Sequence, residues 1–199
     1  MCHLIETICI ESGQARLLPY HAARMQQSRQ ALFGLRNPID LQNALAPRLG
    51  DCQQGLYKCR VVYREQIEEV TFSPYQRPQV RSLKKVYSNS IEYFHKYADR
   101  DALHQLYLQR ETYNDVLIIK NGWVTDMYIG NLLFFDGQQW FTPDTPLLRG
   151  VQRQYLLDEK LISAAKIRES DLENFHSFKF INAMNPFEAS AGVDIRHIH

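Results

Sequence analysis

The chain has 199 residues, of which 45% are hydrophobic and 23% are charged, and its formal net charge is +1. This composition is ordinary for a globular protein, and the length allows one domain or two small ones. Near-neutral charge argues against a nucleic-acid partner, and no apolar run approaches the roughly 20 residues of a membrane helix. The amino terminus lacks the pattern of a secretory signal, so we expect a cytoplasmic protein whose four cysteines, without C-x-x-C spacing, are reduced thiols.

The first part of the chain carries alternating strand and helix signals. Turn residues at Ser12-Gly13 separate two short apolar runs, and Pro19 ends the second of them. In chain order we expect strands at 3–10 and 15–18, a helix from 21 to 34, a shorter helix from 37, and paired strands at 56–63 and 67–72. Residues 1–79 should therefore form a small N-terminal α+β domain.

Residues 80–199 should form a larger C-terminal domain. Asn121-Gly122 and Asp136-Gly137 are hairpin turn signals, and Asp99 can cap a helix. In chain order we expect a strand at 80–87, a helix after 99, hairpins at 116–126 and 132–141, a helix at 151–161, an extended segment at 163–167, a short helix at 171–175 and a strand at 178–183. The histidines of the final residues 196–199 are expected to be frayed and solvated, and we predict no metal site.

Lys96 is the first candidate for chemistry. It stands among Tyr93, Phe94 and Tyr97, which could desolvate the amine, lower its pKa and free it to form a Schiff base. Taken alone, a lysine near aromatic residues is more often a structural side chain whose stem is buried.

Three further residues could bind a phosphorylated cofactor. Gly150 opens the helix that begins Val151-Gln152, where free N–H groups and the helix dipole suit a phosphate. Arg24 could be the charged partner of that phosphate, and Asp126, at the end of a hairpin strand, could accept the protonated nitrogen of a pyridine ring. Each has a plain alternative: a loop-to-helix junction, a solvated helix residue and a turn aspartate.

In order and spacing, these residues resemble the class IV aminotransferase family, the fold-type IV pyridoxal-phosphate enzymes, from Ile5-Glu6-Thr7-Ile8 to Asn182-Ala183-Met184. The matching segments are His21-Ala22-Ala23-Arg24-Met25, Lys96, Gly122-Trp123-Val124-Thr125-Asp126, Asn131-Leu132-Leu133-Phe134, Thr142-Pro143, Gly150-Val151-Gln152-Arg153 and Phe180-Ile181-Asn182-Ala183. The resemblance implies an α+β, two-domain fold of the D-amino-acid aminotransferase type, with a barrel-like C-terminal domain. It also implies pyridoxal 5'-phosphate as the cofactor and a homodimer acting on a small amino-acid-like substrate.

The resemblance also assigns roles to residues. Lys96 would be the catalytic Schiff-base lysine, and the cofactor would be bound by Lys96, Arg24, Asp126, Asn131, Gly150, Val151, Gln152, Asn182 and Ala183. Two departures stand out: relatives have an additional early strand, and Asp126 replaces the family's glutamate.

Two segments look like those of aminodeoxychorismate lyase. Arg100 follows Lys96 in a Lys-x-x-x-Arg pattern and could bind a substrate carboxylate, or could simply pair with Asp99 or Glu111. Residues 182–186, Asn-Ala-Met-Asn-Pro, are the second segment. The resemblance therefore suggests a 4-amino-4-deoxychorismate lyase that makes p-aminobenzoate and pyruvate for folate synthesis. The alternatives are an aminotransferase for branched-chain or D-amino acids and a non-catalytic family member.

Overall fold

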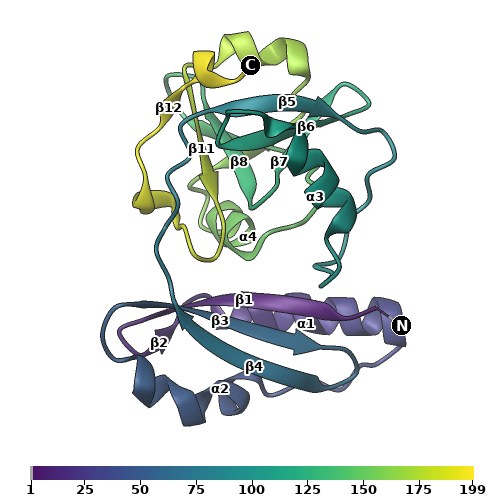
Figure 1. Cartoon of the computed structure of the whole chain (residues 1–199), viewed down its shortest axis with the longest axis vertical. Coiled ribbons are helices and arrows are strands. Elements are labelled where there is room, and N and C mark those ends of the chain that lie inside the picture. Colours follow the sequence, from purple (N-terminus) through teal and green to yellow (C-terminus); the bar gives the residue numbers. More distant parts are fainter. Residues whose placement is uncertain (1) are drawn as a thin grey trace. The chain divides into compact units, whose positions relative to one another are not determined.

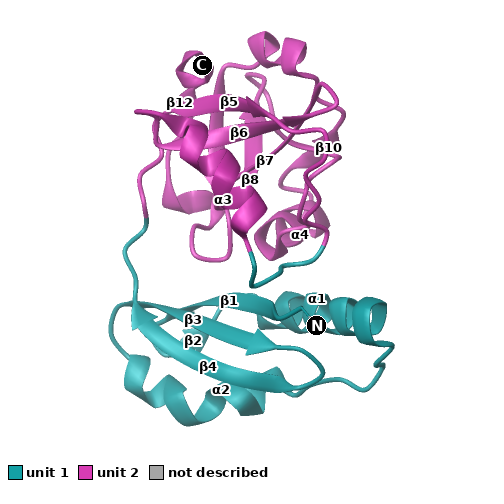
Figure 2. Ribbon diagram, turned by 45° about the vertical axis from the view of Figure 1, so that its right-hand side comes forward, with its two compact units in different colours: residues 1–77, 95–99 teal, residues 78–94, 100–199 magenta. Residues whose placement is uncertain are grey.

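The computed structural model describes residues 2–199, and these divide into two compact units (Figure 2). The first unit contains the chain to Arg77 together with His95–Asp99, and the second contains Pro78–Phe94 and Arg100–His199. We expected the whole of 80–199 to be one domain. The contacts of His95–Asp99 instead place this short segment with the first unit.

The first unit is a four-stranded antiparallel sheet whose buried face carries two helices (Figure 1). The strand order is β2 (Gln14–Ala15), β1 (Leu4–Glu11), β3 (Leu56–Tyr63), β4 (Ile67–Pro74), and the helices are α1 (Leu18–Phe33), α2 (Leu41–Leu49) and the 3₁₀ turn η1 (Gly50–Cys52). Alternate residues of β1 point into the core, so Glu6 lies on the same face as Leu4 and Ile8. All four cysteines are free, and Cys9, Cys52 and Cys59 are buried.

Local capping signals set the boundaries of the two helices, and the signal that starts α2 was not recognised in the sequence. Helix α1 has a proline in its first turn and ends at Gly34, whose φ of 71° is the left-handed conformation that glycine tolerates. The strand expected at 15–18 is shortened to β2 (Gln14–Ala15), because α1 begins at Leu18. Helix α2 does not start at 37 as predicted, because the Asp40 carboxylate accepts the N–H of Asn43 at 2.9 Å and caps the helix there.

The second unit is an eight-stranded sheet with short helices around it (Figure 1). Its strands are β5 (Leu83–Tyr87), β6 (Asp115–Lys120), β7 (Trp123–Met127), β8 (Asn131–Phe135), β9 (Trp140–Pro143), β10 (Ser163–Ala165), β11 (Ser177–Ile181) and β12 (Val193–Asp194). The order is β10-β9-β8-β7-β6-β5, and β11 pairs with β8 and β12. Within the described residues β5 and β10 do not meet, so the barrel-like domain that we expected is an open sheet.

The helices of the second unit are short. They are α3 (Asp101–Tyr107), α4 (Val151–Asp158) and the 3₁₀ turns η2 (Leu108–Arg110), η3 (Glu169–Asn174), η4 (Phe187–Ala189) and η5 (Ile195–His197). The predicted cap at Asp99 is wrong, because Arg100 is the residue that precedes α3 and it makes no capping bond with its side chain. The hairpin at Asn121-Gly122 is confirmed, with φ values of 53° and 76° that suit a tight two-residue turn.

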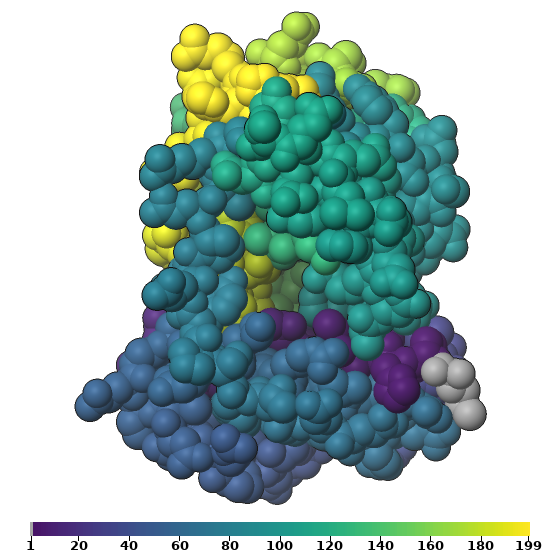
Figure 3. Space-filling view, in the orientation of Figure 1, coloured from purple at the N-terminus to yellow at the C-terminus, as the bar shows by residue number. Residues whose placement is uncertain are grey.

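The last residues of the chain are paired rather than frayed. His199 donates its N–H to the carbonyl of Leu83 at 2.9 Å and accepts the N–H of Lys85 at 2.6 Å, so it extends the edge of β5. The space-filling view shows this C-terminal segment in yellow on the surface of the second unit (Figure 3). Across residues 2–199, the structure has no helix with the length and apolar character to span a membrane.

Candidate active site

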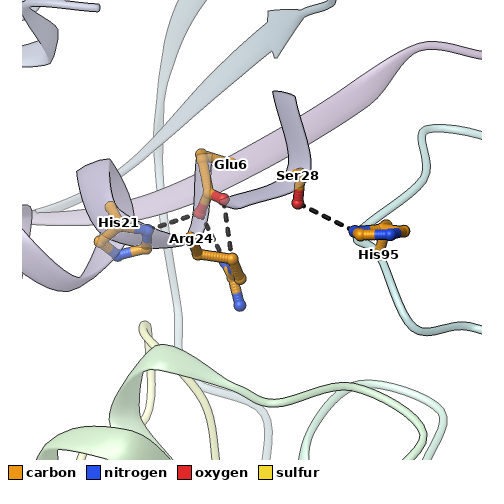
Figure 4. A network of polar contacts seen from close by, with 5 residues as sticks. All are labelled: Glu6, His21, Arg24, Ser28 and His95. Atoms are coloured by element: carbon orange, nitrogen blue, oxygen red, sulfur yellow. Dashed lines mark hydrogen bonds and ion pairs between the residues drawn. The ribbon is translucent and has the colours of Figure 1, made fainter. Parts of the chain in front are cut away.

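The first unit contains a buried ion cluster between β1 and α1 (Figure 4). Glu6, which is fully buried, accepts a hydrogen bond from Nε of Arg24 at 3.0 Å and a second from its Nη2 at 2.5 Å. Nδ1 of His21 lies 2.6 Å from Oε2 of the same carboxylate, the oxygen that Nη2 of Arg24 also contacts. The forked contact fixes the plane of the Arg24 guanidinium.

The environment of this cluster decides its charges. Burial alone would raise the pKa of Glu6, but the positive charge of Arg24 and the hydrogen bond from His21 hold that pKa at about 2. Burial lowers the pKa of His21, and the charges of Arg24 and Lys96 lower it further, so its imidazole stays neutral despite the contact with Glu6. Glu6 is therefore an anion with one cationic partner.

Lys96 is attached to the same sheet by its backbone. Its carbonyl accepts the N–H of Ile5 at 2.9 Å, and Ala98 donates its N–H to the carbonyl of His3 at 2.9 Å. The neighbouring His95 contacts Oγ of Ser28, on α1, at 3.1 Å through its Nδ1. The structure thus brings Lys96 and Arg24 into one unit.

In the second unit, Asp126 is the centre of a buried polar group. Its Oδ1 accepts the side-chain amide of Asn131 at 2.8 Å, and its Oδ2 accepts the N–H of Leu148 at 2.9 Å. The same Asn131 amide donates to the carbonyl of Leu148 at 2.8 Å. Burial raises the pKa of Asp126 to about 6, and these hydrogen bonds oppose the rise.

Gly150 brings helix α4 against this group. A Cβ at position 150 would lie 2.1 Å from Oδ1 of Asn131, so only glycine fits. No side chain caps α4 at Gly150, and the helix continues through Val151 and Gln152, both buried. Asp126, Asn131 and the N-terminus of α4 are therefore close together.

Asn182 and Ala183 lie in a tight turn after β11. The Asn182 amide donates to the carbonyl of Ile129 at 2.9 Å, and its oxygen accepts the backbone N–H groups of Met184 and Asn185, each at 2.9 Å. Asn182 thereby ties the end of β11 to the β7–β8 turn. Its role in cofactor binding stays a prediction.

Arg100 is engaged within its own unit. Its Nη2 donates to the carbonyl of Tyr128, and its guanidinium lies 4.2 Å from the centre of the Tyr128 ring. It also helps to lower the pKa of Asp115, which burial raises to about 6. The part we predicted for Arg100 in substrate binding is untested, and these contacts give it a structural function as well.

Two residues of these groups were not singled out from the sequence. Glu6 lies between two inward-facing apolar residues of its strand, Leu4 and Ile8, and an acid in that position is a sign of a buried ion pair. Arg153 was noted only as part of a motif. It is buried, and it donates to Oγ1 of Thr142 at 3.2 Å and to the carbonyl of Pro143 at 2.8 Å.

Comparison with known proteins gives consistent matches. Residues 3–187 match the family model for amino-transferase class IV. An uncharacterized protein of Haemophilus influenzae is 39% identical over 187 residues, which are 93% of this chain and 99% of that protein. The crystal structure of a "putative 4-amino-4-deoxychorismate lyase" from Haemophilus somnus is 38% identical, with a TM-score of 0.90 over 94% of this chain and 98% of that one.

A more distant structure shares the fold. A hypothetical aminotransferase from Mycobacterium tuberculosis, solved in a form bound to pyridoxal phosphate (PLP), is 17% identical. Its TM-score is 0.79, and the match covers 99% of this chain and 81% of that one.

Proposed function

Because the chain belongs to the class IV aminotransferase family, whose members are PLP-dependent enzymes, we propose that it binds this cofactor and acts as a lyase of the 4-amino-4-deoxychorismate type. Its products would be p-aminobenzoate and pyruvate, which would place it in folate synthesis. The presence of Lys96, Arg24 and Asp126 at the family's positions favours a catalytic member over the non-catalytic alternative.

The observation that carries the lyase proposal is the similarity to the Haemophilus somnus protein. The match extends over 98% of that chain at 38% identity. The lyase proposal is also supported by Arg100, four residues after Lys96, and by the sequence Asn-Ala-Met-Asn-Pro at 182–186.

Taken separately, the two units each contain residues that suit the cofactor. Arg24 offers a guanidinium whose orientation is fixed by Glu6. The start of α4 offers backbone N–H groups next to Gly150, a position where no side chain would fit. Asp126 offers a buried carboxylate at the position of the family's glutamate, on a side chain that is one methylene shorter. We propose that the phosphate would be held by Arg24, Gly150, Val151 and Gln152. Asp126 and Asn131 would bind the ring, and Lys96 would bind the aldehyde carbon. Asn182 and Ala183, which follow β11, would contact the cofactor on its phosphate side.

When bound, PLP supplies a positively charged ring that accepts the electron pair left on the substrate's Cα. The chain's own groups handle protons and orientation. Lys96 Nζ would take the Cα proton as the general base. Asp126, ionised above its pKa of about 6, would keep a proton on the ring nitrogen by charge. Arg100 would orient a substrate carboxylate.

Pyruvate release tests the lyase. Purified protein given aminodeoxychorismate should release pyruvate and p-aminobenzoate in equal amounts, and the Lys96→Ala variant should release neither. Lys58→Ala, a half-buried lysine of the same sheet, is the matched control and should keep the activity.

Conversion of bound PLP to its pyridoxamine form by an amino acid, without pyruvate release from aminodeoxychorismate, would point instead to the aminotransferase alternative. The same preparation tests a further proposal, that the protein is a homodimer, by light scattering.

A further inference from the structure

The second unit contains a cavity of about 540 Å³ that none of the proposed cofactor residues lines. It lies between the β6–β7 hairpin, the loop before α4 and Phe94. Trp123 and Thr125 face it from β7, whereas Val124 packs in the core and Asp126 bonds to Leu148. Neither Asp126 nor its partner Asn131 lines the cavity.

The volume and lining are those of a small-molecule site. Known ligand pockets span roughly 300–1,000 Å³ and have apolar walls with a few polar groups. Here the apolar walls are Trp123, Pro146 and Leu147, and Phe94 adds an aromatic ring that is 66% exposed. Aromatic rings left open to solvent beside a cavity favour a flat, apolar ligand.

The charges of the lining favour an anion. Lys120 and Arg149 contribute two cations, against one carboxylate from Asp144. Nζ of Lys120 donates to the carbonyl of Ile91 at 2.6 Å, which fixes its position and leaves two further N–H groups. Trp123 is held from outside the cavity by Arg168, whose guanidinium lies 4.1 Å from the indole centre. The aromatic wall and the ammonium group are thus both positioned by contacts already made.

We propose that this cavity binds a small aromatic carboxylate, with the ring against Trp123 and Phe94 and the carboxylate on Lys120 and Arg149. This second site does not require bound PLP, and it goes beyond the function proposed above. A ligand there would touch the loop 144–149, which leads directly into Gly150.

Fluorine NMR with 4-fluorobenzoate tests the proposal, and 4-fluorobenzamide serves as the uncharged probe of the same shape. The acid should bind at least about tenfold more tightly than the amide, which corresponds to one strong charged contact. Lys120→Met should weaken the acid by about three- to tenfold and leave the amide unchanged. Lys166→Met, an exposed lysine outside the cavity, is the control and should change neither.

Two more variants separate this site from others. Thr145→Trp, which puts a large side chain into the cavity from an exposed position, should abolish binding of both probes. Lys96→Ala should bind the acid as the wild type does, with or without PLP, so the outcome is independent of the proposed lyase activity. Equal binding of acid and amide, or binding that survives Thr145→Trp, would refute the proposal. The proposal would also be refuted if the wild-type protein bound neither probe and the Thr145→Trp variant became monomeric. The cavity would then be a contact between subunits.

Discussion

Asn131 lies 2.8 Å from Asp126, and the same amide group reaches the carbonyl of Leu148 at an equal distance. One side chain therefore connects β8, the acid of β7 and the loop before α4. Removing it takes this donor from Oδ1 of Asp126 and from the carbonyl of Leu148, while Oδ2 of Asp126 keeps the N–H of Leu148. This arrangement gives the first prediction.

Asn131→Ala should lower the free energy of unfolding by about 1–3 kcal/mol, the cost of leaving buried polar groups unsatisfied. Urea unfolding at pH 7 measures it. The matched control is Asn43→Ala, because Asn43 donates to Asp40 in the same way at 2.7 Å but on the surface. That variant should lose less than about 1 kcal/mol, and similar losses for the two variants would show that burial of the Asn131 group is unimportant.

Gly150→Ala should displace Asn131 and weaken PLP binding. The φ of Gly150 is −67°, which alanine adopts freely, so the effect comes only from the Cβ that would meet Oδ1 of Asn131 at 2.1 Å. We expect at least about a tenfold increase in the dissociation constant of PLP, measured by fluorescence titration, equivalent to about 1.4 kcal/mol.

Gly50→Ala is the control for Gly150→Ala. Gly50 also has a negative φ, of −59°, and a Cβ there would meet no atom within 4 Å. PLP affinity and stability should stay the same or improve slightly in this variant. A Gly150→Ala protein that binds PLP as tightly as the Gly50→Ala protein would contradict the cradle at α4.

Glu6→Gln should destabilise the first unit strongly. It removes the anion that pairs with Arg24 in a buried site, and breaking a buried pair by neutralising one partner typically costs about 3–5 kcal/mol. Thermal unfolding followed by circular dichroism would show the loss.

The control for Glu6→Gln is Glu11→Gln, on the same strand, whose partners Arg16 and Arg77 are at the surface. Exposed pairs contribute about 0–1 kcal/mol, so this variant should be nearly neutral. If the Glu6→Gln protein retained stability but lost PLP affinity, the function of Glu6 would be to orient Arg24 rather than to stabilise the fold.

Asp126 gives a pH dependence with a definite sign. Its pKa is about 6 in the folded protein against an ordinary value of 3.8, so the folded state holds a proton that the unfolded state releases. Stability from this group is fully present below about pH 4 and is lost as pH rises to about 6, by about 3 kcal/mol in all.

The measurement compares the wild type with Asp126→Asn by urea unfolding at several pH values without PLP. The difference in unfolding free energy should shift in favour of the variant between pH 4 and 6 and then stay constant. Glu6, with its pKa of about 2, contributes in the opposite direction: its stabilisation is present above about pH 4.5 and is lost toward pH 2 in both proteins. A difference that does not change with pH would mean that Asp126 is not desolvated.

Local signals predicted those parts of the fold that local chemistry determines. The Asn121-Gly122 hairpin, the end of α1 at Gly34 and the pairing of β3 with β4 were all evident in the sequence. The start of α2 was missed because two signals competed, Pro38 and the capping Asp40. The open edge of the second sheet could not be predicted, since it depends on pairings between distant segments.

For the candidate site, the sequence identified residue types but not their partners. Arg24 and Asp126 were recognised by motif, while Glu6 and the N–H of Leu148 that engage them are distant along the chain. Arg100 shows the limit most clearly. Its motif suggested a substrate ligand, and nothing local indicated that Nη2 and one face of its guanidinium would contact Tyr128.

The attachment of Lys96 to β1 has a consequence for how the protein is made. Ile5 emerges early from the ribosome, yet its N–H finds its partner only when residue 96 has been synthesised. A fragment that stops at Arg77 would contain all four strands of the first sheet and still expose one edge of β1. The nascent first unit should therefore reach full protection from proteolysis only after translation has passed Asp99.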